Sequence, residues 1–375
     1  MAAFDGVNGP TWRVQLYKSG TWTDVLVADV QEIRLKRGRT RADQPPVAGV
    51  ANITLDNMSG IYDPDYTATS TWVVGGVSII RDGLAGRIIA TWASTTYVLF
   101  VGVLETALVD AGFSPTVTLT FIDGLAQIAK VEIPFLPSYQ YLNETTSARV
   151  GRVLTACGWT AGTSLTGTLQ MQSTIQGLNA LTMIEQCVAV QAGAFYISRN
   201  GVATLLPNTD KFSRPTQLLF HDDRSTNTVE YDSITTSPGT LQVINHAIVT
   251  RGKLKQKVAT YTASVTKYGL KSLYIEAFIQ SDVHAQNLAH YYAWKDATPQ
   301  TTVTQIQFSA IALGALYPDF LSCELQDQVV VKRNTVDGRL LNMNLVIEGM
   351  DHTITPSNWL VTFNTSPMNP YRVTI

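Results

Sequence analysis

Short stretches that alternate apolar and polar residues dominate the first third of the chain. In Val117-Thr118-Leu119-Thr120-Phe121, the alternation places Val117, Leu119 and Phe121 on one face of a strand. Each stretch is rich in β-branched residues and is bounded by Gly, Pro, Asp or Asn. The pattern predicts one antiparallel barrel or sandwich. Its strands are expected at 11–17, 29–38, 49–57, 97–105 and 116–124.

The apolar spacing changes to that of a helix after Pro134. Over 146–157, apolar residues recur at i, i+3, i+4 and i+7, and Gly158 is a natural C-terminal stop. These apolar residues are Val150, Val153, Leu154 and Cys157. The spacing predicts an amphipathic helix that covers one face of a small domain.

A second helix and a hairpin are expected directly afterwards. Asn179 is a suitable N-cap for a helix that Gly193 ends, and its predicted apolar face holds Leu181, Ile184 and Val188. The dipeptide Asn200-Gly201 then predicts a tight turn between two strands.

Strand patterns return from about Gly239, with one more helix among them. The helix is expected at about 281–296 behind Ser281 as its N-cap. Its apolar stripe consists of Ala285, Leu288, Ala289 and Tyr292. The strands are expected within 240–252, 256–265, 302–311, 327–333, 341–354 and 359–367.

These patterns divide the chain into three predicted domains. A first β-barrel domain spans 1–133, an α/β domain spans 134–238, and a second β-barrel domain with the inserted helix spans 239–375. The fold class expected is therefore mainly β with a smaller α/β part: two related antiparallel β-barrels that flank a small α/β domain.

The two β-rich regions also contain a loose internal repeat. Residues 100–124 and 346–367 each give a strand through a glycine, a polar-alternating arm, a break with Ser and Pro, and a returning strand that begins Val-Thr. The sequence predicts equivalent hairpins in two related barrels, one around Gly102 and Phe121 and one around His352.

Composition narrows the functional classes. A net charge of −2 gives no field that would hold phosphates, and the 15 % charged fraction leaves a surface rich in uncharged polar residues. Three widely spaced cysteines fit neither a disulfide framework nor a zinc site. No leader and no membrane anchor are expected, because no apolar run approaches the length of a membrane span.

The histidines are interpreted as structural. His352 alternates with Met350 and Ile354, which predicts a histidine packed on the inner or interfacial face of a hairpin. His284 and His290 share a helix but are six residues apart, whereas a helical metal pair needs i, i+4 spacing. No metal site is therefore predicted.

Three charged segments also favour structural interpretations. The acidic patch Asp222, Asp223, Glu230 and Asp232 suits paired-carboxylate hydrolysis, but a solvated interdomain linker is preferred because no aromatic subsite or motif accompanies it. Residues 56–65 only faintly suggest a calcium loop and are interpreted as turns. The basic run 33–41 is predicted to be a strand that leads into a solvated or subunit-contacting loop.

The order of the motifs resembles minor tail and tail-hub proteins of long-tailed bacteriophages. The resemblance rests on "GRTRADQPPVAGVANITLDNMSGIYDPD", on "ALTMIEQCVAVQAGAFYISRNGVATLLP" and on "IEGMDHTITPSNWLVTFNTSP", which come from all three regions. It implies a structural hub of a phage tail tip: a homotrimeric, pseudo-sixfold ring that adapts a sixfold tube to a threefold tip and leaves a channel for DNA. The family has no shared catalytic residues.

The resemblance also implies partners. They are further copies of the chain, a distal tail or tail tube protein, a tape measure protein, and tip, fibre or other minor tail proteins, with DNA only in transit. The location implied is the tail tip of the virion, after assembly in the cytoplasm of the bacterial host.

No enzyme, catalytic residue, cofactor or metal is predicted, because the chain contains no P-loop, nucleophile elbow, HExxH helix or CxxC pair. The alternatives are a receptor- or carbohydrate-binding minor tail protein, a hexameric distal tail protein, and a hydrolase that uses Asp222 or Glu230.

Overall fold

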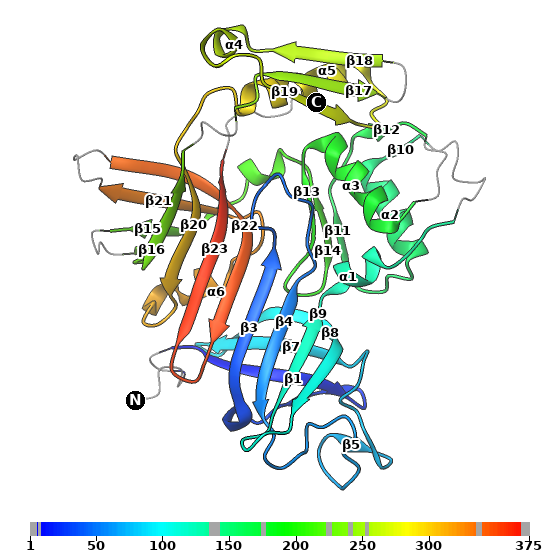
Figure 1. The fold of residues 1–375 in the computed structure, drawn as a ribbon, viewed down its shortest axis with the longest axis vertical. Coiled ribbons are helices and arrows are strands. Elements are labelled where there is room, and N and C mark those ends of the chain that lie inside the picture. The colour runs from blue at the N-terminus through cyan, green and yellow to red at the C-terminus, as the bar shows by residue number, and fades with distance from the viewer. Residues whose placement is uncertain are drawn as a thin grey trace.

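The computed structural model describes residues 6, 9–134, 143–173, 178–222, 227–238, 243–251, 255–334 and 340–368. The protein is mainly β, as the sequence predicts, with a smaller α/β part. One large sheet runs through both β-rich regions and crosses the molecule from β16 on one side to β8 on the other (Figure 1). Its strand order is β16-β20-β23-β22-β3-β4-β9-β8-β7-β1-β2, and β21 and β15 branch from β22.

The first β-rich region contains all five strands expected there. Its elements are β1 (Thr11–Lys18), β2 (Thr21–Asp24), η1 (Val27–Asp29), β3 (Val30–Gly38), β4 (Val50–Asp56), β5 (Val73–Val74), β6 (Val77–Ser78), β7 (Ala85–Trp92), β8 (Thr95–Asp110) and β9 (Thr116–Ile122). Val117, Leu119 and Phe121 are buried together, so the predicted alternation of β9 is confirmed. Sequence reasoning missed β7, which does not alternate because three consecutive residues, Ile88, Ile89 and Ala90, are all buried.

The second β-rich region holds the four strands expected after residue 300 and two more from the middle of the chain. Its elements are β15 (Thr216–His221), β16 (Ser233–Ser237), β20 (Thr302–Ser309), η5 (Gly314–Leu316), α6 (Tyr317–Ser322), β21 (Gln328–Asn334), β22 (Leu340–Ile354) and β23 (Trp359–Pro367). The acidic patch lies between β15 and β16, so its interpretation as an interdomain linker is wrong. Both flanking strands belong to the same sheet.

Strand pairing shows that the two regions are duplicates. The strands β3-β4-β9-β8-β7-β1 neighbour each other in that order, and β16-β20-β23-β22-β21-β15 do the same. The correspondence also preserves the order along the chain. We call these the first and the second strand set. They differ in their last pair, since β1 is antiparallel to β7 whereas β15 is parallel to β21.

Matching β-bulges align the two sets residue by residue. In β8 the pairing with β9 skips Glu105, between Leu104 and Thr106, and in β22 the pairing with β23 skips Glu348, between Ile347 and Gly349. The predicted repeat is therefore confirmed, but in a shifted form: Gly349 corresponds to Thr106 and not to Gly102.

A small α/β part separates the two strand sets in sequence. It contains α1 (Gly124–Ala129), β10 (Glu144–Thr145), α2 (Thr146–Ala156), β11 (Thr163–Leu165), β12 (Gln170–Met171), α3 (Ala180–Gln191), β13 (Ala194–Ile197), β14 (Ala203–Leu206) and η3 (Asp210–Phe212). Both helices and the hairpin at Gly201 are confirmed. The Asn179 side chain caps α3 by accepting a hydrogen bond of 3.0 Å from the Leu181 amide.

The predicted apolar face of α3 is only partly right. Ile184 is buried, but Leu181 and Val188 are half-buried. The helix instead buries Met183, Cys187 and Val190 along with Ile184. Eight of the twelve residues of this helix are apolar and cover a wide arc of its surface, so periodicity alone did not decide which side meets the core.

Another small sheet is formed by residues that lie between β16 and β20 in the sequence. It is formed by β17 (His246–Arg251), β18 (Lys255–Thr260) and β19 (Ser272–Glu276), and it packs on α5 (Asp282–Lys295), with α4 (Thr262–Tyr268) between β18 and β19. The strand expected over 256–265 is wrong in its second half, which is α4. The helix α5 and its Ser281 cap are confirmed, although Tyr292 is only half-buried.

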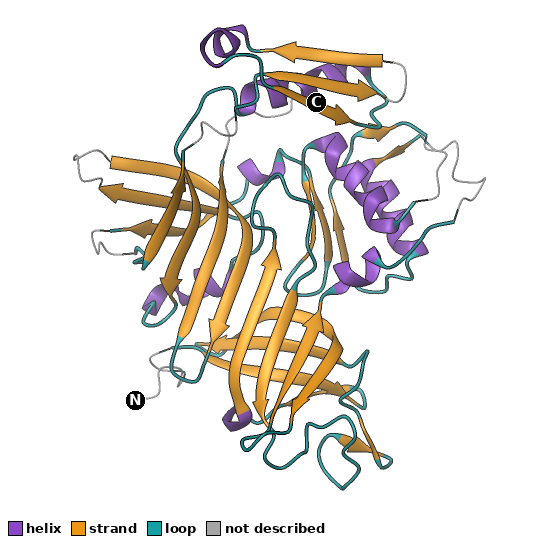
Figure 2. Cartoon of the chain, in the orientation of Figure 1, coloured by secondary structure: helices purple, strands orange, loops and turns teal. Residues whose placement is uncertain are grey.

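Most of the helices lie in the α/β part and beside the β17–β19 sheet (Figure 2). The described residues form two hydrophobic cores. The first combines residues of both strand sets, from Trp12 to Phe363. The second joins α1, α2 and α3 to the β17–β19 sheet and α5, from Leu125 to Ala293. The domain boundaries at 133 and 238 stay a prediction, and the packing adds that β17–β19 and α5 share a core with the α/β part.

The aromatic centre of the second strand set provides a test of this core. Phe363 is fully buried, and its ring centroid lies 5.2 Å from that of Phe308 and 6.1 Å from that of Phe220. We expect Phe363→Ala to lower the free energy of unfolding by about 3–5 kcal/mol, because the lost ring leaves a cavity. Urea unfolding measures the change, and the exposed turn variant Ser357→Ala is the control, expected within about 0.5 kcal/mol of wild type.

Candidate functional site: the junction of the two strand sets

The two strand sets meet where β3 pairs with the second half of β22. The pairing is antiparallel and runs from Gly38 opposite Gly349 to Ile33 opposite Ile354. This contact makes one sheet of the two sets, because it joins the edge strand of the first to an inner strand of the second. We call it the junction.

The paired glycines at the end of the junction allow the two backbones to approach closely. A Cβ on Gly38 would lie 2.3 Å from the carbonyl oxygen of Glu348, and a Cβ on Gly349 would lie 2.5 Å from that of Arg39. Gly38 also has a φ of +76°, which favours glycine. Any side chain at either position would push the two strand sets apart.

The bulged Glu348 is the most connected charged group at the junction. Arg39 Nε donates to its Oε2 at 2.8 Å, Gln326 Nε2 donates to Oε2 at 3.0 Å, and Ser366 Oγ donates to Oε1 at 2.6 Å. Burial alone would raise the pKa of Glu348, but the charge of Arg39 and these hydrogen bonds outweigh burial and lower it. The carboxylate therefore holds its charge inside the protein.

A second buried ion pair ties the junction to the α/β part. Arg37 is only 3 % exposed, and its Nη2 donates to Glu324 Oε1 at 2.6 Å and to the carbonyl oxygen of Ile197 at 3.1 Å. Glu324 Oε2 also accepts a hydrogen bond of 2.8 Å from the Arg199 amide. The two ion pairs, Arg39–Glu348 and Arg37–Glu324, thus bring together both strand sets and the α/β part.

His352 has the structural role that the sequence predicts. Its Nδ1 accepts a hydrogen bond of 3.1 Å from Trp359 Nε1, and both side chains are buried beside Phe320. Burial, with a smaller contribution from the charge of Arg37, lowers the pKa of His352 to about 3. The ring is therefore neutral near pH 7, and it serves as a packed acceptor.

The other sequence candidates do not come together as a site. His284 is buried against the Val190 carbonyl, whereas His290 is exposed and stacks on Trp294. Within the residues that the structure describes, no three His, Cys, Asp or Glu side chains are arranged to hold a metal ion.

The acidic and turn segments have ordinary structural contacts. Asp222 accepts a hydrogen bond of 2.9 Å from the Asn334 amide, and Glu230 and Asp232 are exposed. Asp223 lies outside the described residues. In 56–65, Asn57 Oδ1 accepts from the Tyr62 amide at 3.1 Å, which agrees with the turn interpretation.

The basic run 33–41 needs a correction. Arg34, Lys36 and Arg41 are exposed as expected, but Arg37 and Arg39 are buried or half-buried in the ion pairs of the junction. Sequence reasoning missed them because it gave the run no acidic partners: Glu324 and Glu348 lie about 300 residues away. The matching Val-Leu-Glu at 103–105 and Val-Ile-Glu at 346–348 was the signal available for Glu348.

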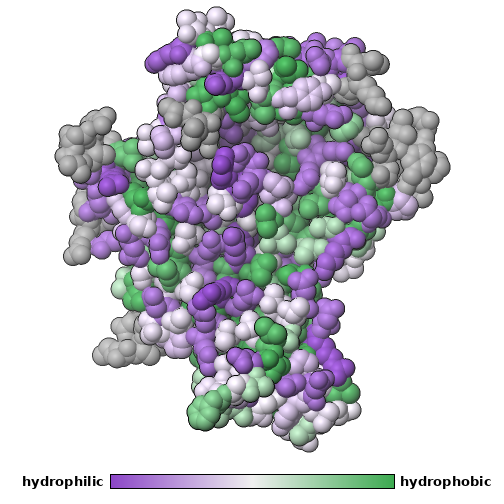
Figure 3. Space-filling model, in the orientation of Figure 1, coloured by the Kyte–Doolittle hydropathy of each residue, from purple (hydrophilic) through white to green (hydrophobic). Residues whose placement is uncertain are grey.

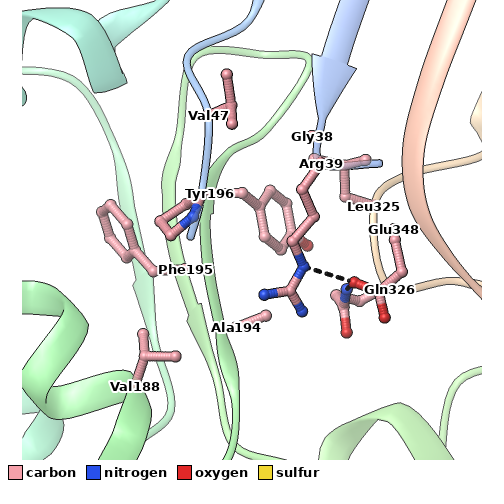
Figure 4. A pocket seen from close by; sticks show the side chains of 11 residues that line it. Gly38, Arg39, Val47, Val188, Ala194, Phe195, Tyr196, Leu325, Gln326 and Glu348 are labelled. Carbon is pink, nitrogen blue, oxygen red and sulfur yellow. Dashed lines mark hydrogen bonds and ion pairs between the residues drawn. The ribbon is translucent and has the colours of Figure 1, made fainter. Parts of the chain in front are cut away.

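A small hollow opens beside the Arg39–Glu348 pair, lined also by Phe195, Tyr196 and Leu325 (Figure 4). Its cavity volume is about 30 Å³, which leaves room for water. No helix in the described part of the chain is long and apolar enough to cross a membrane.

Solved structures share this architecture. The 43 kDa tail protein of prophage MuSo2 from Shewanella oneidensis aligns over 95 % of this chain and 98 % of its own with a TM-score of 0.61 and 11 % identity. A tail protein from Neisseria meningitidis aligns over 95 % and 96 % with a TM-score of 0.63 and 9 % identity. A prophage tail protein from Listeria monocytogenes aligns over 94 % of both chains with a TM-score of 0.52 and 9 % identity.

The chain has the fold of phage tail proteins. No family model and no curated protein matches it in sequence. At about a tenth of identical residues, the likeness to these tail proteins is one of fold and not of sequence.

The energetic cost of a side chain at Gly38 has two parts, the clash with the facing backbone and the positive φ, and a second glycine allows them to be measured separately. Gly38 and Gly76 have nearly equal φ values of +76° and +79°, but Gly76 has no heavy atom within 4 Å of an added Cβ. We expect Gly76→Ala to cost about 1–2 kcal/mol from φ alone, and Gly38→Ala to cost about 1–3 kcal/mol more from the clash. Urea unfolding of both variants measures the difference, and equal losses would contradict the role assigned to Gly38.

The buried carboxylate of Glu348 also predicts a pH dependence. Its pKa in the folded protein lies below the usual 4.5, so its stabilisation is complete above pH 4.5 and is lost as the pH falls through the folded pKa. At pH 7 we expect Glu348→Gln to cost about 3 kcal/mol, because Arg39 loses its buried partner. The deficit should shrink below pH 4.5 in unfolding measurements.

The duplication supplies a matched control. Glu105 occupies the equivalent bulge but is exposed and pairs with the exposed Lys130. We expect Glu105→Gln to change stability by no more than about 0.5 kcal/mol at either pH. A loss as large as that of Glu348→Gln would show that the bulge, and not the buried ion pair, needs the glutamate.

Proposed function

We propose that this protein is a structural hub of a phage tail tip, a homotrimeric pseudo-sixfold ring that joins a sixfold tube to a threefold tip. The observation that carries the proposal is the duplicated strand set. Two equivalent sets in each chain and three chains in a ring give six equivalent units, which is the arrangement that symmetry matching requires. The tail-protein fold supports a place in a phage tail.

The free face of the large sheet is the surface suited to line a channel. The opposite face is covered by the core that contains Ile53, Leu119 and Phe363. On the free face, Thr120 donates to Asn52 at 2.9 Å, and Thr54 lies beside Thr118. Figure 3 shows mostly hydrophilic and intermediate residues over these strands, with a few hydrophobic ones among them.

Charges on this face are balanced. Arg34 pairs with Glu32 at 2.8 Å, and Lys36 is the strand neighbour of Asp351. A surface whose charges balance neither holds nor repels a polyanion strongly, which suits DNA that passes without binding.

The proposed partners follow from this place in the particle. A distal tail or tail tube protein would contact the sixfold side, tip or fibre proteins would contact the threefold side, and the tape measure protein would end at the channel. The location proposed is the tail tip of the virion. The role is structural rather than catalytic, because the mechanism is the geometry of the interfaces. The duplication favours this hub over a hexameric distal tail protein, which needs only one such barrel.

The copy number tests the proposal. Light scattering of the purified chain across a range of concentrations is expected to show a trimer, and electron microscopy is expected to show rings with six similar lobes. A stable monomer at all concentrations, or a hexamer, would contradict it. Binding of the protein to isolated host cell walls without ring formation would favour a receptor- or carbohydrate-binding protein.

A further inference from the structure

Several strand edges of the large sheet have no strand partner among the described residues, and those of β16 and the outer half of β8 are two of them. The strand β16, of sequence Ser-Ile-Thr-Thr-Ser, pairs only with β20. In β8, Thr95–Val103 pairs with β7, but the outer half, Thr106–Asp110, pairs only with β9. Figure 1 places these edges at opposite sides of the sheet.

Within the chain, the equivalents of these two edges are already joined. The equivalent of β16 is β3, and the equivalent of the outer half of β8 is the second half of β22. Those two segments pair at the junction. In the second strand set, the edge of β22 is therefore occupied by β3. The equivalent edge in the first set, on the outer half of β8, is open in the described part of the chain. The strand equivalent to β3, which is β16, is free to pair with it.

The duplication also fixes a register. Because Glu105 corresponds to Glu348, Leu108 corresponds to Asp351. Across the sheet, Ile33 opposite Ile53 corresponds to Ile234 opposite Ile306, so Arg34 corresponds to Thr235. The pairing of β16 with β20 shifts by one residue between Thr235 and Thr236. Counted along β16 itself, which continues through this shift, Lys36 corresponds to Ser237. The junction places Asp351 opposite Lys36. The same pairing between copies would place Leu108 opposite Ser237, and Asp110 opposite Thr235.

The residues of both edges suit strand addition. Proteins protect free edges with lysine, proline or inward charges, yet Ser233–Ser237 contains none of these. In the outer half of β8, Leu108 is 71 % exposed and the only charge is Asp110. By contrast, Asp351, the equivalent of Leu108 in β22, is half-buried and has Lys36 of β3 opposite it. An exposed leucine on an unprotected edge is expected where another strand will cover it.

We propose that β16 of one copy pairs antiparallel with the outer half of β8 of a second copy, in the register of the junction. The inference rests on the proposed ring and names the surfaces that build it. Each contact is head-to-tail, since it uses different edges of the two copies, and repetition closes a ring instead of a simple dimer. The sheet then continues from copy to copy through β16, β20, β23, β22, β3, β4, β9 and β8.

Disulfide trapping tests this register. The double variant Leu108→Cys/Ser237→Cys is assembled under reducing conditions, mildly oxidised and separated on a non-reducing gel. Cross-strand Cα atoms lie about 4.5–5.5 Å apart, within disulfide range. We expect cross-linked dimers and trimers. A mixture of the two single variants should give dimers only, which shows that the bond joins separate copies.

A register-shifted control makes the test specific. In Leu108→Cys/Thr236→Cys, the second thiol moves by one residue to the other face of β16, so cross-linking should fall to the background of wild type oxidised in parallel, whose three native cysteines remain. The pair Asp110→Cys/Thr235→Cys keeps the proposed register. It serves as a second matched pair if the first variant fails to fold.

The outcomes separate this inference from the proposed function. Specific cross-links in both matched pairs support the interface. A trimer by light scattering without these cross-links, or with equal cross-linking of the shifted control, overturns the interface but leaves the ring. The absence of any assembly overturns both.

Discussion

The antiparallel pairing of β3 with β22 is the contact on which the rest of the structure depends. It fuses two strand sets into one sheet and thereby places a single core behind both. The pairing needs two facing glycines and a bulge that turns Glu348 inward to Arg39. Buried ion pairs contribute little net stability, because desolvation offsets their attraction. In this protein, the Arg39–Glu348 ion pair links a residue that follows β3 of the first set to the bulge in β22 of the second.

Duplication explains how a long chain can be built mainly from one plan. Each set keeps the same strand order and the same bulged hairpin, and additional elements are inserted at different points of the chain. The α/β part lies between the sets, and the β17–β19 sheet with α5 is inserted between β16 and β20. These two insertions pack against each other and form the second core. Equivalent units with different insertions can face different neighbours on the two sides of one ring.

The divergence between the sets has a physical direction. Glu348 is buried and hydrogen-bonded, whereas Glu105 is exposed, because only the bulge of β22 is covered by another strand of the same chain. The same contrast separates buried Met350 from half-buried Ala107. The two bulges have kept the same geometry in different surroundings, and the surroundings determine which charges must be paired.

Local pattern by itself determined five strands of the first region, both helices of the α/β part, the cap residues Asn179 and Ser281, and the existence of a repeated hairpin. Alternation, capping and turn chemistry act over a few residues, so they can be identified without a structure. The packed position of His352 was also predictable from the alternation around it.

Only the tertiary structure decided the rest. Three features depend on distant neighbours: the helix at 262–268, the buried face of α3, and the place of β15 and β16 in the large sheet. The basic run concealed two internal arginines, because the pairing of Arg37 with Glu324 and of Arg39 with Glu348 forms across about 300 residues of chain. Long-range pairing fixes such contacts, and a local pattern carries no information about which distant carboxylate will face a given arginine.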